Sequence, residues 1–179
     1  MQPTPHPSLS AFVQAFNEVF LPRWNTTLEG GFPEPLYEPA TAYRPARIQF
    51  TRDYINSALH EVAHWCIAGE ERRKQVDYGY WYRPDGRDAL EQAEFFRSEI
   101  KPQALELAFS RLLGLEFHVS CDNLSGASGG EKEFEDAVHQ QLTLYEVEGF
   151  PPRATETIRM LGLFPHSFVV VVVGSTRRA

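Results

Sequence analysis

The stretch SALHEVAHWCIAG, residues 57–69, largely decides how this sequence is interpreted. Two histidines, His60 and His64, stand four residues apart, and Glu61 directly follows the first of them. Side chains four apart on an α-helix lie nearly above one another, so both imidazoles can face one metal ion. A carboxylate beside them can orient or deprotonate a bound water molecule. The spacing therefore predicts a metal-binding helix, with Glu61 as a catalytic residue.

The apolar residues around this motif predict how the helix is buried. We expect the helix to begin near Thr51 or Asp53 and to run to Ala68, ending at Gly69. At about 100° per residue, five side chains share one face with Ile55: Ala58, Leu59, Val62, Ala63 and Cys66. The two histidines fall at the border of this face, and the cysteine is expected to be a core thiol.

Two histidines leave a metal ion short of ligands, and the sequence offers several for the third place. The residues after His64 read WCIAGEE, without the third histidine of an HExxHxxGxxH site. Glu99 is the best candidate, because Pro102 is expected to break the preceding helix and turn Glu99 inward. The other candidates are Asp77, Asp85, Asp88, Glu94, Asp122 and His118.

Two histidines and one carboxylate suit two kinds of chemistry. On a six-coordinate metal they leave several positions open, which suits Fe(II) and dioxygen. In tetrahedral geometry with one water, the same ligands suit a zinc-dependent hydrolase, either a peptidase or an endoribonuclease, with Glu61 as its general base. A purely structural zinc site is disfavoured, because closely spaced sets of Cys and His ligands are absent from the sequence.

The rest of the pattern predicts an α/β (α+β) fold, a single compact domain with a small sheet packed by helices. The expected helices are 8–20, 88–98, 102–113, 131–147 and 151–162. Residues 46–50 are expected to form a strand, 25–46 to be irregular, and the tyrosines of 78–82 to be strand-like. We expect one metalloenzyme domain over 1–165 and a tail over 166–179 that contains a run of valines.

Composition narrows the class of protein. Among 179 residues, 42% are hydrophobic, which is typical of a globular chain. The net charge of −7 argues against direct nucleic-acid binding, which needs a basic surface. No secretory signal is visible, the valine run is too short to span a membrane, and two cysteines cannot form a disulfide framework. These features predict a cytoplasmic protein without a membrane partner.

Four blocks of sequence, in order over roughly residues 35–150, resemble the bacterial elongation factor P hydroxylase family. They are SALHEVAHWCIAG (57–69), VDYGYWYRPDGRDA (76–89), EIKPQALE (99–106) and FHVSCDNLSG (117–126). The resemblance implies a compact fold similar to the metal-dependent endoribonucleases that mature ribosomal RNA. It further implies a non-haem iron hydroxylase that uses O2 and acts on elongation factor P carrying a β-lysyl-modified lysine.

Carried onto this sequence, the resemblance assigns Fe(II) to His60, His64 and, as the carboxylate ligand, Glu99. A β-lysyl-lysine carries ammonium groups, which aromatic faces and carboxylates bind well. Segment 77–88 is rich in both kinds of side chain. The expected substrate-binding residues are Asp77, Tyr80, Trp81 and Asp122.

Overall fold

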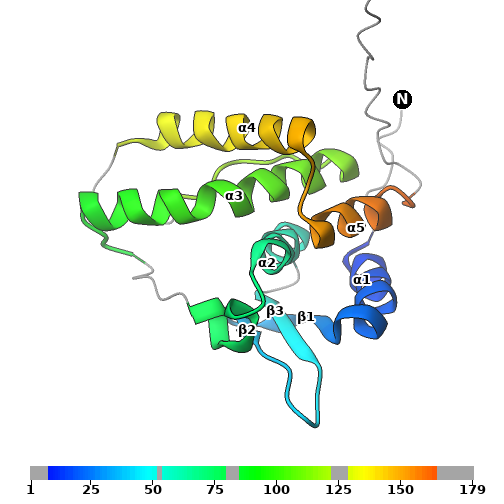
Figure 1. The fold of residues 1–179 in the computed structure, drawn as a ribbon. Helices are drawn as coiled ribbons and strands as arrows, with labels where there is room; N and C mark the ends of the chain where they lie inside the picture. The colour runs from blue at the N-terminus through cyan, green and yellow to red at the C-terminus, as the bar shows by residue number, and fades with distance from the viewer. Residues whose placement is uncertain (1–7, 52–53, 80–84, 122–128, 165–179) are drawn as a thin grey trace, which may run out of the picture.

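The computed structural model describes residues 8–51, 54–79, 85–121 and 129–164, and it has the α+β architecture expected from the sequence. In these ranges five α-helices accompany a three-stranded sheet, which lies at one end of the molecule with the helices packed to one side of it (Figure 1). The elements are α1 (Leu9–Trp24), β1 (Thr26–Phe32), β2 (Leu36–Glu38), β3 (Ala46–Thr51), α2 (Ile55–Ile67), η1 (Arg72–Lys74), η2 (Val76–Gly79), α3 (Ala89–Leu113), α4 (Glu131–Glu148) and α5 (Pro152–Leu161).

The small sheet has the strand order β1-β3-β2, with β1 parallel and β2 antiparallel to β3. The expected strand over 46–50 is confirmed, but the prediction that 25–46 is irregular is wrong, because β1 and β2 both lie there. Strand β1 contains two glycines, Gly30 and Gly31, which are uncommon in strands, so its sequence does not predict a strand. Gly30 is needed where it stands, because a Cβ atom there would lie 2.5 Å from the ring of Phe50.

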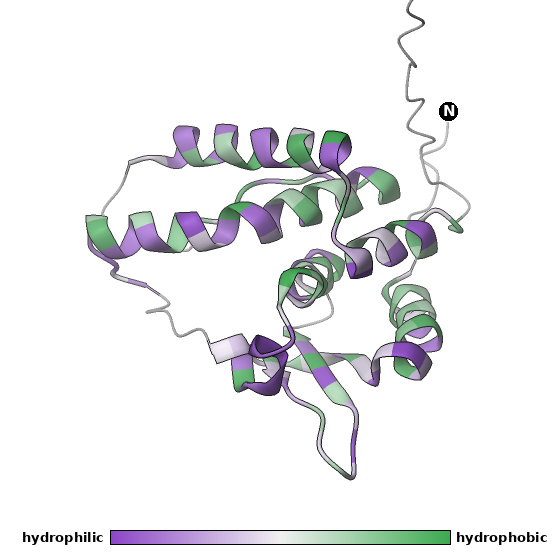
Figure 2. Cartoon of the chain, in the orientation of Figure 1, coloured by the Kyte–Doolittle hydropathy of each residue, from purple (hydrophilic) through white to green (hydrophobic). Residues whose placement is uncertain are grey.

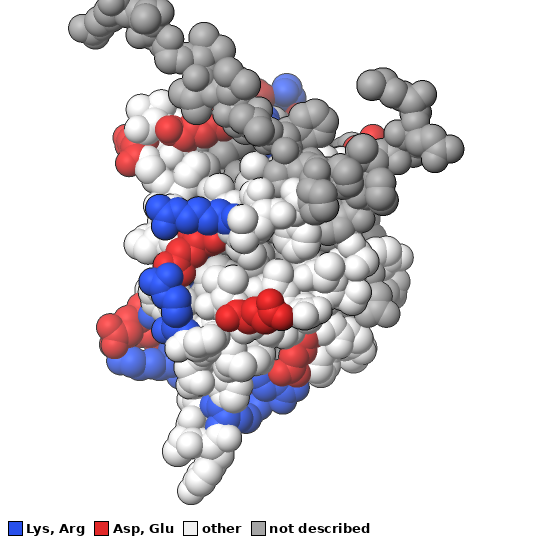
Figure 3. Space-filling model, turned by 90° about the vertical axis from the view of Figure 1, so that its right-hand side faces the viewer, with Lys and Arg blue, Asp and Glu red and all other residues white. Residues whose placement is uncertain are grey.

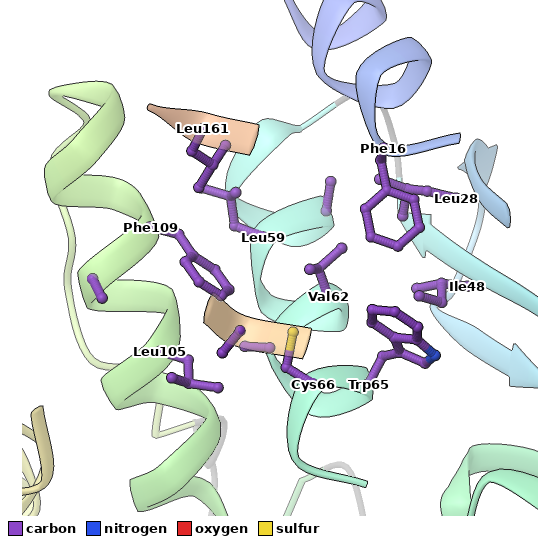
Figure 4. Packing of buried hydrophobic residues seen from close by; sticks show 14 of the residues in the cluster. Phe16, Leu28, Ile48, Leu59, Val62, Trp65, Cys66, Leu105, Phe109 and Leu161 are labelled. Carbon is purple, nitrogen blue, oxygen red and sulfur yellow. The ribbon is translucent and has the colours of Figure 1, made fainter. Parts of the chain in front are cut away.

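Helix α2 lies at the centre of the molecule, between the sheet and α3 (Figure 1). The apolar face expected for it is buried, and side chains from β1, β3, α1, α3 and α5 close around it (Figure 4). Trp65, which is completely buried, makes edge-on ring contacts with Phe16 and Phe20 of α1. Cys66 is a buried core thiol, as expected. The apolar face of the helix that carries the histidines is therefore held firmly in the core.

Helix α3 is one continuous helix of 25 residues, from Ala89 to Leu113. It begins at a capping box formed by Asp88 and Glu91 and ends at Gly114, whose φ of 67° is left-handed. The prediction that Pro102 ends a first helix is wrong, since the proline lies inside the helix and is buried. The packing of α3 against α2 and α4 maintains the helix through the proline, which costs one backbone hydrogen bond.

The other helices are amphipathic or partly so and complete the shell around the core. Along α1 and α4, hydrophobic residues recur with the period of a helix, between hydrophilic ones (Figure 2). Helix α4 lies alongside α3, and α5 contacts α1, α2 and α3 (Figure 1). The predicted helices 8–20, 131–147 and 151–162 are thus confirmed, each within a few residues of its expected ends.

The segment after α2 differs from the expectation of strand-like aromatics. Its described part consists of two short 3-10 turns, and Asp77 and Tyr78 both have a positive φ, of 47° and 57°. This bend stacks Tyr78 on Tyr37 of β2, with ring centroids 4.1 Å apart. The rest of the tyrosine-rich stretch and the valine run lie outside the described residues.

Surface charge agrees with the acidic composition. On the face that carries α1 and α5, lysine and arginine side chains alternate with acidic ones and leave much of the surface uncharged (Figure 3). The described residues of this face therefore form no continuous basic area of the kind that phosphate backbones need (Figure 3). Among the helices that the structure describes, none is long and apolar enough to cross a bilayer.

Candidate metal centre

The two histidines of α2 and Glu99 of α3 converge on one point. The Nε2 atoms of His60 and His64 are 3.1 Å apart, and Oε1 of Glu99 is 3.3 Å from Nε2 of His64. The other carboxylate oxygen, Oε2, is 3.6 Å from Nε2 of His60. Ligand atoms about 2.1 Å from one ion, at 90–110° to each other, are separated by about 3.0–3.4 Å. The three side chains therefore fit a single metal ion bound between them, and no other such group of three occurs within the described ranges.

Helical spacing on α3 explains how Glu99 reaches this point. Glu99, Gln103 and Glu106 follow one another at four and three residues and are all buried on the side that faces α2. Gln103 holds Glu99 through a hydrogen bond of 3.4 Å from Nε2 to Oε2. The same amide donates to the carbonyl of Ser120 and accepts from its backbone N–H, at 2.9 and 3.0 Å. Glu99 thus points inward because of its position on a continuous helix, without a turn at the proline.

His60 has a second carboxylate partner. Oε2 of Glu106 lies 2.8 Å from Nδ1 of His60, the ring nitrogen that does not face Glu99. Sequence reasoning missed Glu106 and Gln103. The signal that could have found them was their spacing of four and seven residues from Glu99 within the block EIKPQALE.

Charges around the centre are strongly coupled. Burial alone would lower the pKa of His60, but the hydrogen bond to Glu106 and the charges of Glu106, Glu99 and Glu61 outweigh it and raise this pKa to about 10. Burial would raise the pKa of Glu99, but His64 and His60, together with the Gln103 hydrogen bond, lower it to about 2. The centre is therefore built to keep positive charge between its carboxylates, which is what a metal cation supplies.

Glu61 is half-buried on α2 beside the two histidines. Burial raises the pKa of its carboxyl group, the histidines lower it, and the charges of Glu99 and Asp77 raise it further. A carboxyl group with a raised pKa takes up a proton more readily than a free one. Its position and its pKa make Glu61 suited to proton transfer at this centre.

An open pocket with a volume of about 720 Å³ adjoins the centre. His64 is part of its wall, and the C-terminal end of α2 and the start of η1 supply most of the rest. Tyr145 of α4 and Lys101 of α3 line the opposite side. Of the three converging side chains, His64 is the one that borders this pocket.

The predicted substrate-binding residues divide into two groups. Oδ1 of Asp77 accepts a 2.8 Å hydrogen bond from the backbone N–H of Tyr37, so one of its oxygens ties η2 to β2. Tyr80, Trp81 and Asp122 lie outside the described residues.

Four of the remaining candidates for the third ligand lie within the described residues and away from the convergence of the histidines. Asp88 caps the N-terminus of α3, where Oδ1 accepts from the N–H groups of Leu90 and Glu91. Asp85, Glu94 and His118 are exposed to solvent. Among the described candidates, Glu99 is the one that the fold brings to the histidines.

Comparison with known proteins agrees with the resemblance seen in the sequence blocks. A family model described as elongation factor P hydroxylase matches residues 15–169. The chain is also 45% identical to the elongation factor P lysine hydroxylase of Haemophilus influenzae over 152 residues, covering 84% of this chain and 85% of the relative. The match extends beyond the four blocks into α1 and α5. The chain belongs to the elongation factor P hydroxylase family.

Proposed function

We propose that this protein hydroxylates a lysine side chain of elongation factor P, using Fe(II) bound by His60, His64 and Glu99. The observation that carries the proposal is the convergence of two imidazoles and one carboxylate within 3.1–3.6 Å of one another. Membership of the hydroxylase family and the name of the H. influenzae relative support the reaction and the substrate. A reaction on a translation factor also fits a cytoplasmic location.

Two imidazoles and one carboxylate on one side of an ion leave the opposite side open, as iron oxygenases require. Bound there, Fe(II) supplies the activation of O2 that hydroxylation of an unactivated carbon needs. The protein contributes a rigid ligand frame, since α2 and α3 are packed together and Gln103 and Glu106 restrain the ligand side chains. Solvent reaches this frame, because His60 is 24% exposed.

We propose that Glu61 holds or moves a proton beside the metal ligands. Glu61 is half-buried, directly follows His60 and precedes His64 by three residues, and its carboxyl group has a raised pKa. It is one helical position out of register with the histidines and is not among the atoms that converge on the ion. We therefore expect Glu61 to act on water or substrate and not to hold the metal.

We further propose that the substrate is the β-lysyl-modified lysine, whose ammonium groups are bound by acidic and aromatic side chains near the pocket. The charge of Asp77 helps to raise the pKa of Glu61, which supports a role for Asp77 in attracting a cationic substrate. Tyr80, Trp81 and Asp122 are proposed as further substrate contacts on the strength of the sequence alone.

The test is an intact-mass assay on β-lysylated elongation factor P, incubated with this protein, Fe(II) and a reductant in air. We expect a gain of one oxygen atom with iron and air, and none under nitrogen or with zinc-loaded protein. His64→Ala should abolish the gain, whereas His139→Ala, which removes an exposed histidine on α4, should not. No gain from protein that carries iron would refute the proposal, and zinc-dependent hydrolysis would be tested next.

A further inference from the structure

The two histidines of the centre are held differently. His60 contacts a carboxylate through each ring nitrogen, Glu106 at Nδ1 and Glu99 at Nε2. His64 contacts Glu99 and His60 through Nε2, and no hydrogen bond to its Nδ1 is found in the described part of the chain. The difference comes from α3, which places Glu106 two helical turns beyond Glu99 against His60.

The contact with Glu106 determines which nitrogen of His60 is available to a metal. A neutral imidazole carries one proton, and an ionised carboxylate can only accept a hydrogen bond. The 2.8 Å contact therefore keeps the proton on Nδ1 and leaves the lone pair of Nε2 directed toward His64 and Glu99. The same bond fixes the plane of the ring, and the negative charge makes the imidazole a stronger donor to a cation.

We propose that Glu106 is a positioning residue that holds His60 in the tautomer and orientation in which Nε2 binds the metal. Glu106 itself is not a ligand, because it contacts the nitrogen on the other edge of the ring. It is 8% exposed, and a buried carboxylate is retained at such a place when it has a partner. This inference rests on the proposed metal site, but it does not depend on the reaction catalysed there.

The binding of Zn(II) and Co(II) to purified, metal-stripped protein tests this inference without any activity measurement. Dissociation constants are measured by competition with a chromophoric chelator for the wild type, Glu106→Ala, Glu106→Gln and Ser110→Ala. Ser110 is the matched control, since it is a buried polar residue one turn further along α3 whose hydroxyl has no hydrogen-bond partner among the described residues. Thermal unfolding of each metal-stripped variant shows whether it is folded.

We expect Glu106→Ala to weaken metal binding by about 10- to 100-fold, and Ser110→Ala to leave it unchanged. Glu106→Gln keeps an acceptor oxygen without its charge, so it should lie between the wild type and Glu106→Ala. The Co(II) absorption bands should change in Glu106→Ala, because the angle and donor strength of one ligand change. In proton spectra of the zinc-loaded protein, the wild type should show a slowly exchanging Nδ1–H signal from His60 that Glu106→Ala lacks.

The outcomes separate this inference from the proposed function. If Glu106→Ala binds metal within about twofold of Ser110→Ala and keeps the Nδ1–H signal, the positioning role is wrong while the metal site stands. If the wild type binds no metal, both the inference and the proposed iron site are wrong. Should Glu106→Ala be unfolded, Glu106→Gln decides the question, and wild-type affinity and an unchanged cobalt spectrum in that variant would overturn the proposal.

Discussion

Replacing Arg153 with methionine should destabilise the protein by loosening the end of the metal-binding helix. The guanidinium group of Arg153, on α5, donates to the carbonyls of Trp65 and Cys66 at 3.0 and 3.1 Å, and also to that of Ala68. These carbonyls belong to the last turn of α2, where no further helical N–H group follows. The same group lies over the rings of Trp24 and Trp65, 5.2 and 5.0 Å from their centroids.

The size of the effect follows from which carbonyls lose their donor. Ala68 keeps a second donor, because Nη1 of Arg73 lies 2.7 Å from its carbonyl oxygen. The carbonyls of Trp65 and Cys66 are left buried and unpaired, at about 1–3 kcal/mol each. Lost cation–π contacts add about 1 kcal/mol, and relief of the buried charge of Arg153 offsets part of the total. We expect a net loss of about 3–4 kcal/mol, or a fall in Tm of about 10 °C.

The assay is urea unfolding followed by circular dichroism, with a chelator present so that metal binding does not contribute. Arg159→Met is the matched control, since Arg159 is exposed on the same helix. It should change the free energy of unfolding by less than about 0.5 kcal/mol. The reasoning is refuted if Arg153→Met and Arg159→Met differ by less than about 1 kcal/mol at equal denaturant slopes.

Three further predictions concern the metal ligands and the thiol. Glu61→Gln should impair hydroxylation but retain the metal, whereas His64→Ala should lose the metal. Elemental analysis of both purified variants checks this, and a Glu61→Gln protein found without metal would contradict the prediction for Glu61. The ion must displace a proton from His60, whose pKa is about 10, while Glu99, with a pKa of about 2, stays ionised. Metal affinity should therefore rise by up to about tenfold per pH unit between pH 6 and 8. Metal titrations at several pH values check this, and an affinity that does not change with pH would exclude the competition. Burial raises the pKa of Cys66 to about 12. At pH 8, thiol reagents should therefore modify Cys66 about 10³ times more slowly in the folded protein than in the urea-unfolded chain. Equal rates of modification would show that the thiol is accessible in the folded protein.

The features that sequence predicted well depend on spacing within one segment. The pairing of His60 and His64, and the amphipathic helices, follow from the helical period alone. Strand β1 depends instead on parallel pairing with β3, in which Leu28 lies opposite Ile48, and no local pattern announces that contact.

The position of Glu99 also depends on contacts that a local sequence pattern does not contain. Glu99 lies beside the histidines, but the local reason given for it from the sequence is wrong, because the helix continues through Pro102. Its direction is set by the packing of α3 on α2, and so is that of Glu106. A contact between two helices is a tertiary property, which single-helix periodicity cannot provide.

The placement of the proposed metal ligands on two helices also affects the stability of the fold. An ion held by His60 and Glu99 closes a loop of about 40 residues, much as a covalent bridge would. A disulfide persists in the unfolded chain, whereas the ion binds the folded chain, so it stabilises the fold by mass action, by about 4 kcal/mol at a free-ion concentration 1,000 times the dissociation constant. The two cysteines in the described part of the chain, Cys66 and Cys121, are not joined by a disulfide. The ion can therefore act as a reversible cross-link between α2 and α3. Removing it should abolish catalysis and lower the free energy of unfolding.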